Sequence, residues 1–497
     1  MSEKKKVIIV GAGVSGLSAG IYAQLNGFDT QIIEKHFISG GMCTAWYRKN
    51  YRFDYCIQWL AGSKYGTFYE TYKETNVIND DVEILNMDIH NRNLSEDGTD
   101  MIVYTDLDRW QDYLIKMSPE DEKSIRRMCR DIRWCCYLKP FDLAPPLRSI
   151  WDYTKSFFSC FPALYMVLKH KNKSYAEYIR SLKFKNKDLE KKLINIYGEC
   201  DFAAYAFLLI MSWYTKKNAG YPMGGSLEVA KRMQSRFEEY GGEMLLKKEV
   251  DEILTKNEKA IGVKLVDGTI LQADYVISAT DTYTTMYKLL KGNYVTDEFK
   301  KAFSNWSLFT SFVQVSFGIN KKLETDFPVQ VVLAKDKKIG NTQLDHCYRI
   351  LNYNFDKTMA PENKTCIIFR FDSPYKQWKD LTKEEYQEEK RKIEEDTKKL
   401  LEFHYPGSSE FIEVCDVATP LTTIRYTGAW KGAYEGFRPS AKNVIKQLKQ
   451  SLPKLGNFFM ASQWLFPGGG IPPSVQSGKW AVQVICHKEK KKFISKK

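Results

Sequence analysis

The sequence predicts an α/β protein built on a parallel sheet, joined to a second domain of mixed α+β structure. An aliphatic run, KVIIV, is followed directly by a glycine-rich turn near the amino terminus. Two further blocks with strong strand signals lie far along the chain, at 221–290 and from 457 onward. The chain has 497 residues, more than the roughly 300 at which single cores stop growing, so two domains are expected.

The first strand and the glycines after it form a dinucleotide-binding pattern. Gly11, Gly13 and Gly16 stand in the order G-x-G-x-x-G, and the residues that follow carry apolar side chains at helical spacing. Such glycines let the chain turn sharply, approach a pyrophosphate with bare backbone and pack a helix on a strand. A glycine turn that merely packs a β-α-β unit is the alternative, and the complete set of parts disfavours it.

An acidic residue follows at the expected place. Gly27 ends the predicted helix, and TQIIE predicts the next strand, which finishes at Glu34, 18 positions after Gly16. This is near the roughly 20-residue separation of a carboxylate that binds a ribose 2′-hydroxyl. Because a carboxylate repels a 2′-phosphate, the pattern favours FAD or NAD over NADP.

The later strand-rich blocks return the chain to this first domain. YPMGGSLEVAKRMQSRFEEYGG predicts a glycine turn and a helix that stops at Gly241-Gly242, and a hairpin is predicted at Asp267-Gly268. NFFMA, at 457–461, predicts a last strand before the loop SQWLFPGGGIPP and a helix from about Ser474 to His487. The predicted nucleotide-binding domain therefore comprises 1–95, 215–291 and 411–487. The predicted substrate domain comprises 96–214 and 292–410, and 488–497 is a basic tail.

Charge and composition limit the partners. The net charge is +13, partly from the tail KEKKKFISKK, but no base-reading motif accompanies it, so nucleic acid is not an expected partner. No 18-residue apolar run exists, and MSEKKK leads into a strand rather than a signal-peptide core, which predicts a cytoplasmic protein. Eleven cysteines without paired spacing and six scattered histidines predict reduced thiols and no metal site.

One segment is a candidate for contact with a membrane. IWDYTKSFFSCFPALYMVLKHK, at 150–171, carries an apolar stretch that is too short to span, contains Pro162 and is flanked by lysines. This composition suits an interfacial helix or a pocket lid, and an ordinary buried helix is equally compatible. Peripheral association with an anionic membrane, through this segment or the basic tail, is therefore a hypothesis.

Several of these motifs together resemble a known family. GAGVSGL, Glu34, Gly40-Gly41, YPMGG and PGGGIPPSVQSGKWAV resemble the FAD-dependent phytoene desaturase and carotenoid isomerase group, with retinol saturases and flavin amine oxidases as more distant relatives. The resemblance implies an FAD-binding Rossmann-like domain of the glutathione-reductase type and an α+β substrate domain. The chain departs from the family at Asn50 and Cys56, where relatives usually have glycines, and at Ala461-Ser462, where they often have A-G.

The resemblance also implies which residues contact FAD. The first glycine loop would hold the pyrophosphate and Glu34 the adenosine ribose, and GGMCT at 40–44 would be a second glycine loop that passes along the diphosphate. The backbone of Val250 would meet the adenine, and the glycine-proline loop would run beside the isoalloxazine. The implied contacts are Gly11, Ala12, Gly13, Ser15, Gly16, Glu34, Lys35, Gly40, Gly41, Met42, Thr44, Val250, Gly469, Gly470, Ile471 and Pro472.

The residues of the last loop support a flavin independently. Two prolines before Ser474 suit the first turn of a helix, whose positive dipole end attracts negative charge. Reduced flavin carries negative charge near N1 and O2, so this helix would favour hydride acceptance. A loop that simply caps the helix is the plainer alternative.

The leading hypothesis is an FAD-dependent oxidoreductase that acts on carbon-carbon double bonds of a large lipophilic isoprenoid, carotenoid-like or retinoid-like, by hydride transfer at flavin N5. A flavin amine oxidase and a non-redox prenyl-lipid carrier of the GDP-dissociation-inhibitor kind are the alternatives. No second dinucleotide fingerprint is present, so the electron donor or acceptor stays open, as do the substrate, the reaction direction and the oligomeric state.

The sequence assigns no acid or base to this reaction. Arg425, Tyr426 and Asp54 are weak candidates for contact with substrate or flavin, and each also suits a structural or orienting role. The segment TPLTTIRYTGAWKGAYEG, at 419–436, resembles a family strand and loop ahead of the flavin end of the substrate cavity. Trp59, Trp430 and Trp464 are candidates for cavity walls or for the core.

Overall fold

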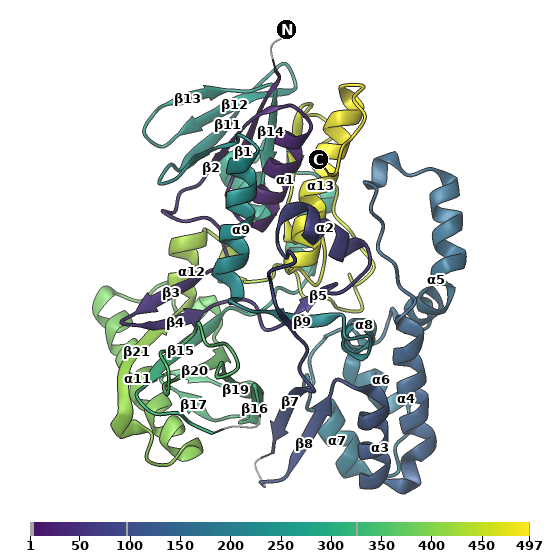
Figure 1. Cartoon of the computed structure of the whole chain (residues 1–497), viewed down its shortest axis with the longest axis vertical. Helices are drawn as coiled ribbons and strands as arrows, with labels where there is room; N and C mark the ends of the chain where they lie inside the picture. The colour runs from purple at the N-terminus through teal and green to yellow at the C-terminus, as the bar shows by residue number, and fades with distance from the viewer. Residues whose placement is uncertain (1–3, 96–97, 325–326, 497) are drawn as a thin grey trace.

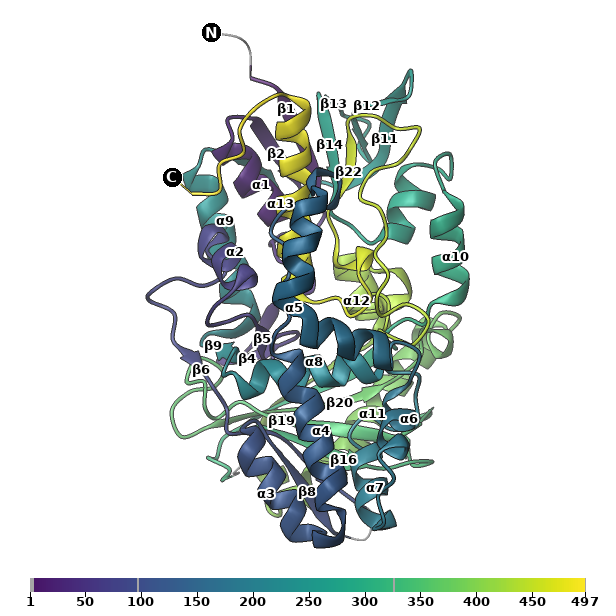
Figure 2. The same ribbon diagram turned by 90° about the vertical axis from the view of Figure 1, so that its right-hand side faces the viewer.

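The computed structural model describes residues 4–95, 98–324 and 327–496. A parallel sheet with its helices forms the upper part of Figure 1, and a second sheet and a group of helices lie side by side below it. Figure 2, turned by 90°, shows the carboxy-terminal helix running along the upper part beside the amino-terminal strand. The α/β class with a second, mixed region is confirmed.

The parallel sheet is assembled from three separate pieces of the chain. Its strand order is β10-β2-β1-β14-β22, and every neighbouring pair is parallel. Ile8 and Ile9 of the central strand are fully buried on opposite faces, as the continuous apolar run predicts. The strands are β1 Lys6–Val10, β2 Asp29–Ile33, β10 Glu243–Leu245, β14 Tyr275–Ser278 and β22 Phe458–Met460.

Helices α1 (Val14–Leu25), α9 (Gly225–Glu239) and α13 (Ile471–Lys488) pack around this sheet. Close packing of α1 and α13 requires Gly478, because an added Cβ would lie 2.6 Å from the Ser15 carbonyl oxygen. Helix α13 begins three residues earlier than predicted, since prolines suit the first helical turn. The predicted hairpin at Asp267-Gly268 is confirmed within the antiparallel strands β11 Val250–Lys256, β12 Lys259–Leu265 and β13 Ile270–Gln272.

The second sheet has the order β21-β15-β20-β19-β16-β7-β8, and helix α11 (Lys383–His404) packs against its strands β15 and β21. Strands β7 and β21 stand in this sheet although the sequence places them at the edges of nucleotide-binding segments, so we propose boundaries near 88 and 419. The strands are β7 Ile89–Leu94, β8 Asp100–Tyr104, β15 Phe312–Ile319, β16 Val329–Leu333, β19 Cys347–Asn352, β20 Thr365–Asp372 and β21 Ile412–Ala418.

A helical layer completes the lower part, at the right of Figure 1. Its members are α3 Leu107–Met117, α4 Glu122–Cys135, α5 Ile150–His170, α6 Tyr175–Ser181, α7 Lys187–Ile194 and α8 Ala204–Thr215. Smaller elements are α2 Thr67–Thr75, α10 Asp297–Asn305, β3 Ala45–Arg48, β4 Tyr51–Asp54, β5 Leu60–Ala61, β6 Ile84–Leu85, β9 Ala219–Pro222, β17 Lys338–Ile339 and β18 Thr342–Gln343.

Helix α5 presents its large apolar side chains to solvent. It runs without interruption through Pro162, and Trp151, Phe158 and Leu168 are 76%, 74% and 64% exposed. The alternative of an ordinary buried helix is therefore wrong, and the alternative of an exposed apolar helix agrees with the structure. Among the described residues, no helix combines the length and hydropathy needed to cross a membrane.

One other segment differs from the sequence-based expectation. The segment after β21 forms a helix, α12 (Pro420–Thr427), rather than continuing as strand and loop, because Thr419 caps it and Pro420 suits its first turn. The described part of the basic tail folds back onto α1, although most of its side chains stay exposed. There the amide of Asn26 exchanges hydrogen bonds of 2.8–2.9 Å with the backbone of Ile494, and Phe493 packs beside Tyr22.

Candidate functional site

The first glycine loop leaves an open space beside bare backbone. A Cβ added at Gly16 would lie 2.0 Å from the Gly11 carbonyl oxygen, so Gly16 serves the packing of strand and helix. A Cβ added at Gly13 would meet no atom within 4 Å, and its φ of −66° is open to any residue. The internal structure of the chain therefore does not need a glycine at 13, whereas a ligand that approaches this backbone does.

The second glycine loop lies against the first. The Gly40 amide donates to the Ala12 carbonyl at 2.8 Å, and a Cβ on Gly41 would lie 3.3 Å from the Gly13 Cα. Met42 and Thr44 continue this loop, and the Thr44 carbonyl accepts from the Tyr55 amide at 3.1 Å. The structure thus brings together two loops that are 30 residues apart, in the manner of a two-sided diphosphate cradle.

Glu34 stands at the carboxyl end of β2, at the edge of this cradle. Its carboxylate accepts from the Ala12 amide at 2.7 Å and from the His36 amide at 2.8 Å. Burial of the carboxylate raises the pKa of Glu34 above its ordinary value, and this effect outweighs the two hydrogen bonds, which act to lower it. Burial lowers the pKa of the neighbouring Lys35. The Lys248 amide donates to the Glu34 carbonyl at 2.9 Å, so the segment that starts β11 at Val250 runs alongside.

The carboxy-terminal glycine loop is held by a second loop at 434–437. Gly469 has a φ of 38°, and an added Cβ would lie 2.2 Å from the Glu435 carbonyl oxygen. Gln463 connects the two loops, because its amide donates to the Tyr434 carbonyl at 2.9 Å and accepts from the Gly470 amide at 2.7 Å. Ile471 and Pro472 then begin α13, which packs on α1.

The three weak acid-base candidates lie away from the glycine-proline loop. Asp54 is fully buried, and its carboxylate accepts from the Ser226 amide and hydroxyl, both at 2.7 Å, which fixes the start of α9. Arg425 and Tyr426 are exposed on α12, and the Tyr426 ring packs on the His36 imidazole, beside Glu34. The structure therefore does not bring these side chains to the glycine-proline loop.

The candidate tryptophans pack within aromatic groups. Trp464 is 3% exposed, and Trp430 stacks on Tyr283 with ring centroids 4.0 Å apart. Trp59 is partly buried and lies 5.3 Å from the Tyr214 ring. Trp464 thus belongs to the core, and Trp59 lies where the helical layer meets the upper part.

A polar group that the sequence does not predict lies where the second sheet meets the segment after β4. Arg370 on β20 donates to the Tyr55 carbonyl at 2.6 Å and to the Gln314 side chain at 2.9 Å. Glu435 lies close by, with a carboxyl oxygen 3.8 Å from where a Cβ on Gly470 would stand, and burial raises its pKa to about 7. Polar residues inside strands resemble the solvent side of any half-buried sheet, so no motif marks them.

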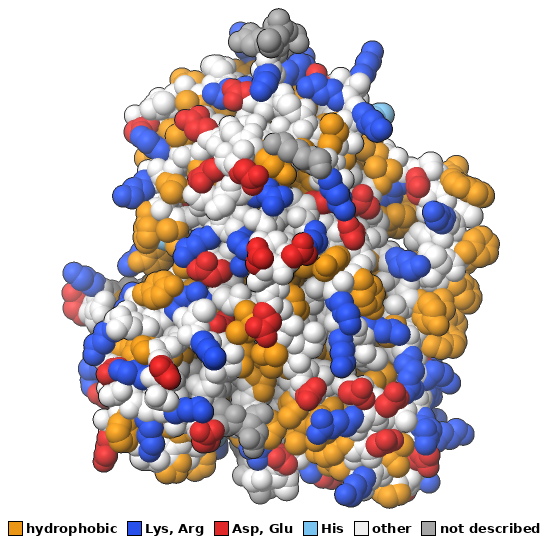
Figure 3. Space-filling view, in the orientation of Figure 1, with side chains coloured by type: hydrophobic (Ala, Val, Ile, Leu, Met, Phe, Trp, Pro, Cys, Tyr) orange, Lys and Arg blue, Asp and Glu red, His pale blue; other side chains and the backbone are white. Residues whose placement is uncertain are grey.

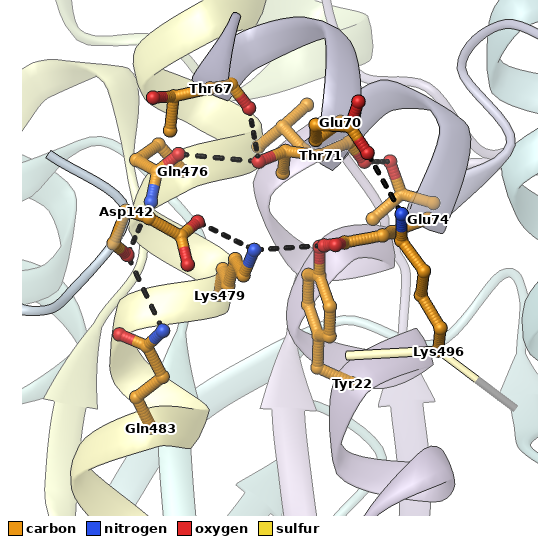
Figure 4. A network of polar contacts seen from close by, with 12 residues as sticks. Tyr22, Thr67, Glu70, Thr71, Glu74, Asp142, Gln476, Lys479, Gln483 and Lys496 are labelled. Atoms are coloured by element: carbon orange, nitrogen blue, oxygen red, sulfur yellow. Dashed lines mark hydrogen bonds and ion pairs between the residues drawn. The ribbon is translucent and has the colours of Figure 1, made fainter. Parts of the chain in front are cut away.

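A buried ion pair fixes the loop that leads into α5 (Figure 4). Lys479 of α13 is 1% exposed, and its ammonium contacts Glu74 at 2.8 Å and Asp142 at 2.6 Å. The Asp142 carbonyl also accepts from the indole of Trp480 at 2.8 Å. The loop before α5 is therefore anchored on the helix that follows the glycine-proline loop.

The described residues contain no group of three or more His, Cys, Asp or Glu side chains arranged to hold a metal ion. All eleven cysteines are free thiols.

Comparison with known proteins agrees with this geometry. Residues 9–75 match the NAD(P)-binding Rossmann-like domain family. The chain is 22% identical to prolycopene isomerase 1 from an Oncidium hybrid cultivar, over 96% of this chain and 83% of that protein. It is 23% identical to the neurosporene-forming phytoene desaturase of Cereibacter sphaeroides, over 96% and 94%. A solved structure of a putrescine oxidase variant has the same fold, with a TM-score of 0.62 at 13% identity, over 98% of this chain and 99% of that one. The predicted resemblance and the assignment as an oxidoreductase are confirmed.

Proposed function

We propose that this homologue of the carotenoid isomerases and phytoene desaturases binds FAD and acts on carbon-carbon double bonds of a large lipophilic isoprenoid. When bound, the flavin would supply hydride transfer at N5. The protein would hold the reacting carbon against that position and keep water away. Desaturation, saturation and isomerisation all use this arrangement.

The observation that carries the proposal is the empty space over Gly13 between two hydrogen-bonded glycine loops, with Glu34 at its edge. Backbone amides and a helix amino terminus suit a diphosphate, and a carboxylate suits ribose hydroxyls. We assign the diphosphate to residues 11–16 and 40–44, the adenosine to Glu34, Lys35 and Val250, and the isoalloxazine to residues 469–472. These are the contacts that the sequence predicts.

Access of a lipophilic substrate is supported by α5. Its exposed side chains form an apolar face, and Lys155, Lys169 and Lys171 flank it with only Asp152 as an acid on the helix. Figure 3 shows hydrophobic side chains gathered at the right-hand edge, where α5 lies in Figure 1. Aromatic residues with flanking lysines suit the interface of an anionic membrane, and we propose that α5 docks there. The apolar face comprises Ile150, Trp151, Tyr153, Phe157, Phe158, Phe161, Tyr165 and Leu168.

The test is organic extraction of the purified protein, with mass spectrometry of what is released. The proposal expects FAD together with an isoprenoid lipid. A flavin accompanied by an amine substrate would favour the amine oxidase alternative instead. A colourless protein that releases only a prenyl lipid would favour the carrier.

A further inference from the structure

The Glu435 carboxyl stands beside the glycine-proline loop without a fixed partner. Apart from its chain neighbours, a Cβ added at Gly470 would meet two atoms within 4 Å, Cδ of Pro472 at 3.7 Å and Oε1 of Glu435 at 3.8 Å. Glu435 is partly accessible, and no hydrogen bond or ion pair of the described residues reaches its carboxylate. This carboxyl therefore borders the backbone that we assign to the isoalloxazine.

Other internal carboxylates of this chain have a visible structural role. Glu34 accepts from two backbone amides, Asp54 from the amide and the hydroxyl of one serine, and Asp281 from a backbone amide at 2.7 Å. Such bonds satisfy an internal carboxylate and fix the backbone around it. The Glu435 carboxylate makes none of them, so holding the backbone does not explain its presence.

The backbone that carries Glu435 is fixed without the help of its side chain. The Gly436 carbonyl accepts from the Phe309 amide, and the Phe437 carbonyl accepts from the Gly468 amide, both at 2.9 Å. The second of these bonds joins the 434–437 loop directly to the glycine-proline loop. The place of the carboxyl therefore follows from the fold.

The charges that act on Glu435 leave its proton affinity close to neutral pH. Arg349 and Arg370, on β19 and β20, act to lower the pKa of Glu435, but burial outweighs them and raises it to about 7. The other titratable groups that interact with Glu435 are the Cys56 thiol and the Tyr434 hydroxyl. Burial raises the pKa of both groups, so they stay neutral. The Glu435 carboxyl can therefore gain or lose a proton in the range where enzymes work.

We propose that Glu435 carries the proton of the reaction, binding it when the flavin is reduced and releasing it when the flavin is oxidised. This inference rests on the proposed function. Adding hydrogen to a carbon-carbon double bond takes one hydride and one proton, and the flavin supplies the hydride. Glu435, beside the ring, would supply the proton.

The step balances in both directions. In saturation, Glu435 gives its proton to one carbon of the double bond while the neighbouring carbon gains a hydride from the reduced flavin. Two C–H bonds replace the π bond, the substrate gains the electron pair, and Glu435 is left as a carboxylate. In desaturation, the Glu435 carboxylate takes the proton from one carbon while the hydride leaves the other for the oxidised flavin.

Electrostatics couples the two events. Negative charge on the reduced ring disfavours a second negative charge beside it, so reduction raises the proton affinity of Glu435. The reduced protein would then hold both hydrogens of the reaction, and the oxidised protein would hold neither.

The test follows the reduction potential of the purified holoprotein against pH, without any substrate. The potential should fall by ~30 mV for each tenfold fall in proton concentration if one proton is bound per two electrons, and by twice that if two are bound. Between about pH 7.5 and 8.5, we expect two protons for the wild type and for Glu435→Asp, and one for Glu435→Gln. Glu394→Gln, at a partly accessible glutamate on α11, should behave like the wild type.

A one-proton slope in the wild type, or a two-proton slope in Glu435→Gln, would overturn the inference and leave the proposed function intact. If Glu435→Gln carries no flavin, the absorbance of the reduced wild type decides between the two. A neutral reduced ring would itself hold the second proton and overturn the inference, whereas an anionic ring with a two-proton slope would support it. Absence of flavin from the wild type would refute the proposed function instead.

Discussion

Gly13 and Gly16 belong to the same motif, but a glycine is needed at each position for a different reason: ligand approach at Gly13 and internal packing at Gly16. Because a Cβ at position 13 meets no protein atom, Gly13→Ala should unfold like the wild type, within about 0.5 kcal/mol, while losing flavin at least about tenfold. Gly16→Ala should destabilise the fold itself, because its Cβ would collide with the Gly11 carbonyl. Urea unfolding of the apoproteins and flavin absorbance of the purified samples measure the two effects. Retention of flavin by stable Gly13→Ala would contradict the assigned cradle.

Glu435 makes stability depend on pH. Its pKa is about 7 when folded, against 4.5 as the reference value, so the folded state binds the extra proton between these values. Stability of the wild type should therefore fall as pH rises from 4.5 to 7, and Glu435→Gln should remove this contribution. The difference in free energy of unfolding between Glu435→Gln and the wild type should shift in favour of the variant by on the order of 1–3 kcal/mol when the pH is raised from 4.5 to 8. A difference that stays constant with pH, in urea titrations at both values, would show that Glu435 does not titrate there.

Sequence patterns identify residues that follow a motif, and miss those that the topology brings together. Gly13 and Glu34 stand at a fixed spacing after a strand, so they can be read directly. Arg370 and Glu435 come from a central strand and from a loop in unrelated parts of the chain. Arg370 owes its place to the packing of β20 against the segment after β4, and Glu435 owes its place to the packing of the 434–437 loop on the glycine-proline loop.

At the scale of elements, the anchor of α5 is a buried charge cluster. Lys479→Met should leave the Glu74 carboxylate buried with the Tyr22 hydroxyl as its hydrogen-bond partner among the described residues, which should cost about 3 kcal/mol. Lys392→Met, which removes an exposed contact with Glu388, should cost less than about 0.5 kcal/mol. Denaturant unfolding compares the two variants. Equal stability of both would mean that the cluster in Figure 4 contributes nothing net.

The apolar face of α5 leads to a separate prediction about membrane binding. Phe158→Glu with Phe161→Glu should reduce co-sedimentation with phosphatidylglycerol vesicles at least about tenfold, since two apolar anchors become charges of the wrong sign. Phe403→Glu, at an equally exposed phenylalanine on α11, should have little effect. If both changes act alike, binding is not specific to α5.

The element types are predictable where one physical signal dominates. The buried strand before the glycines, the helix before Gly241 and the hairpin at Asp267-Gly268 all follow their patterns. The composition of α5 is compatible with a buried helix or an interfacial one, because the exposure of a helix depends on which other elements pack against it. Helix α12 follows from a local signal, the capping residue Thr419. The expectation for this segment came from its resemblance to a family strand and loop, and not from that signal.

At the scale of the whole molecule, the chain returns twice to complete one parallel sheet. That assembly is predictable because each returning block has strand signals of its own. The second sheet is less predictable, because β7 and β21 join it from segments that lie far apart in the chain.

The most direct measurement is the stoichiometry of flavin in the purified wild type. The protein is denatured, and the released nucleotide is identified and quantified by chromatography against FAD. We predict FAD, bound at one per chain, with reconstitution of the apoprotein by added FAD. A protein that neither carries FAD nor takes it up would contradict the account.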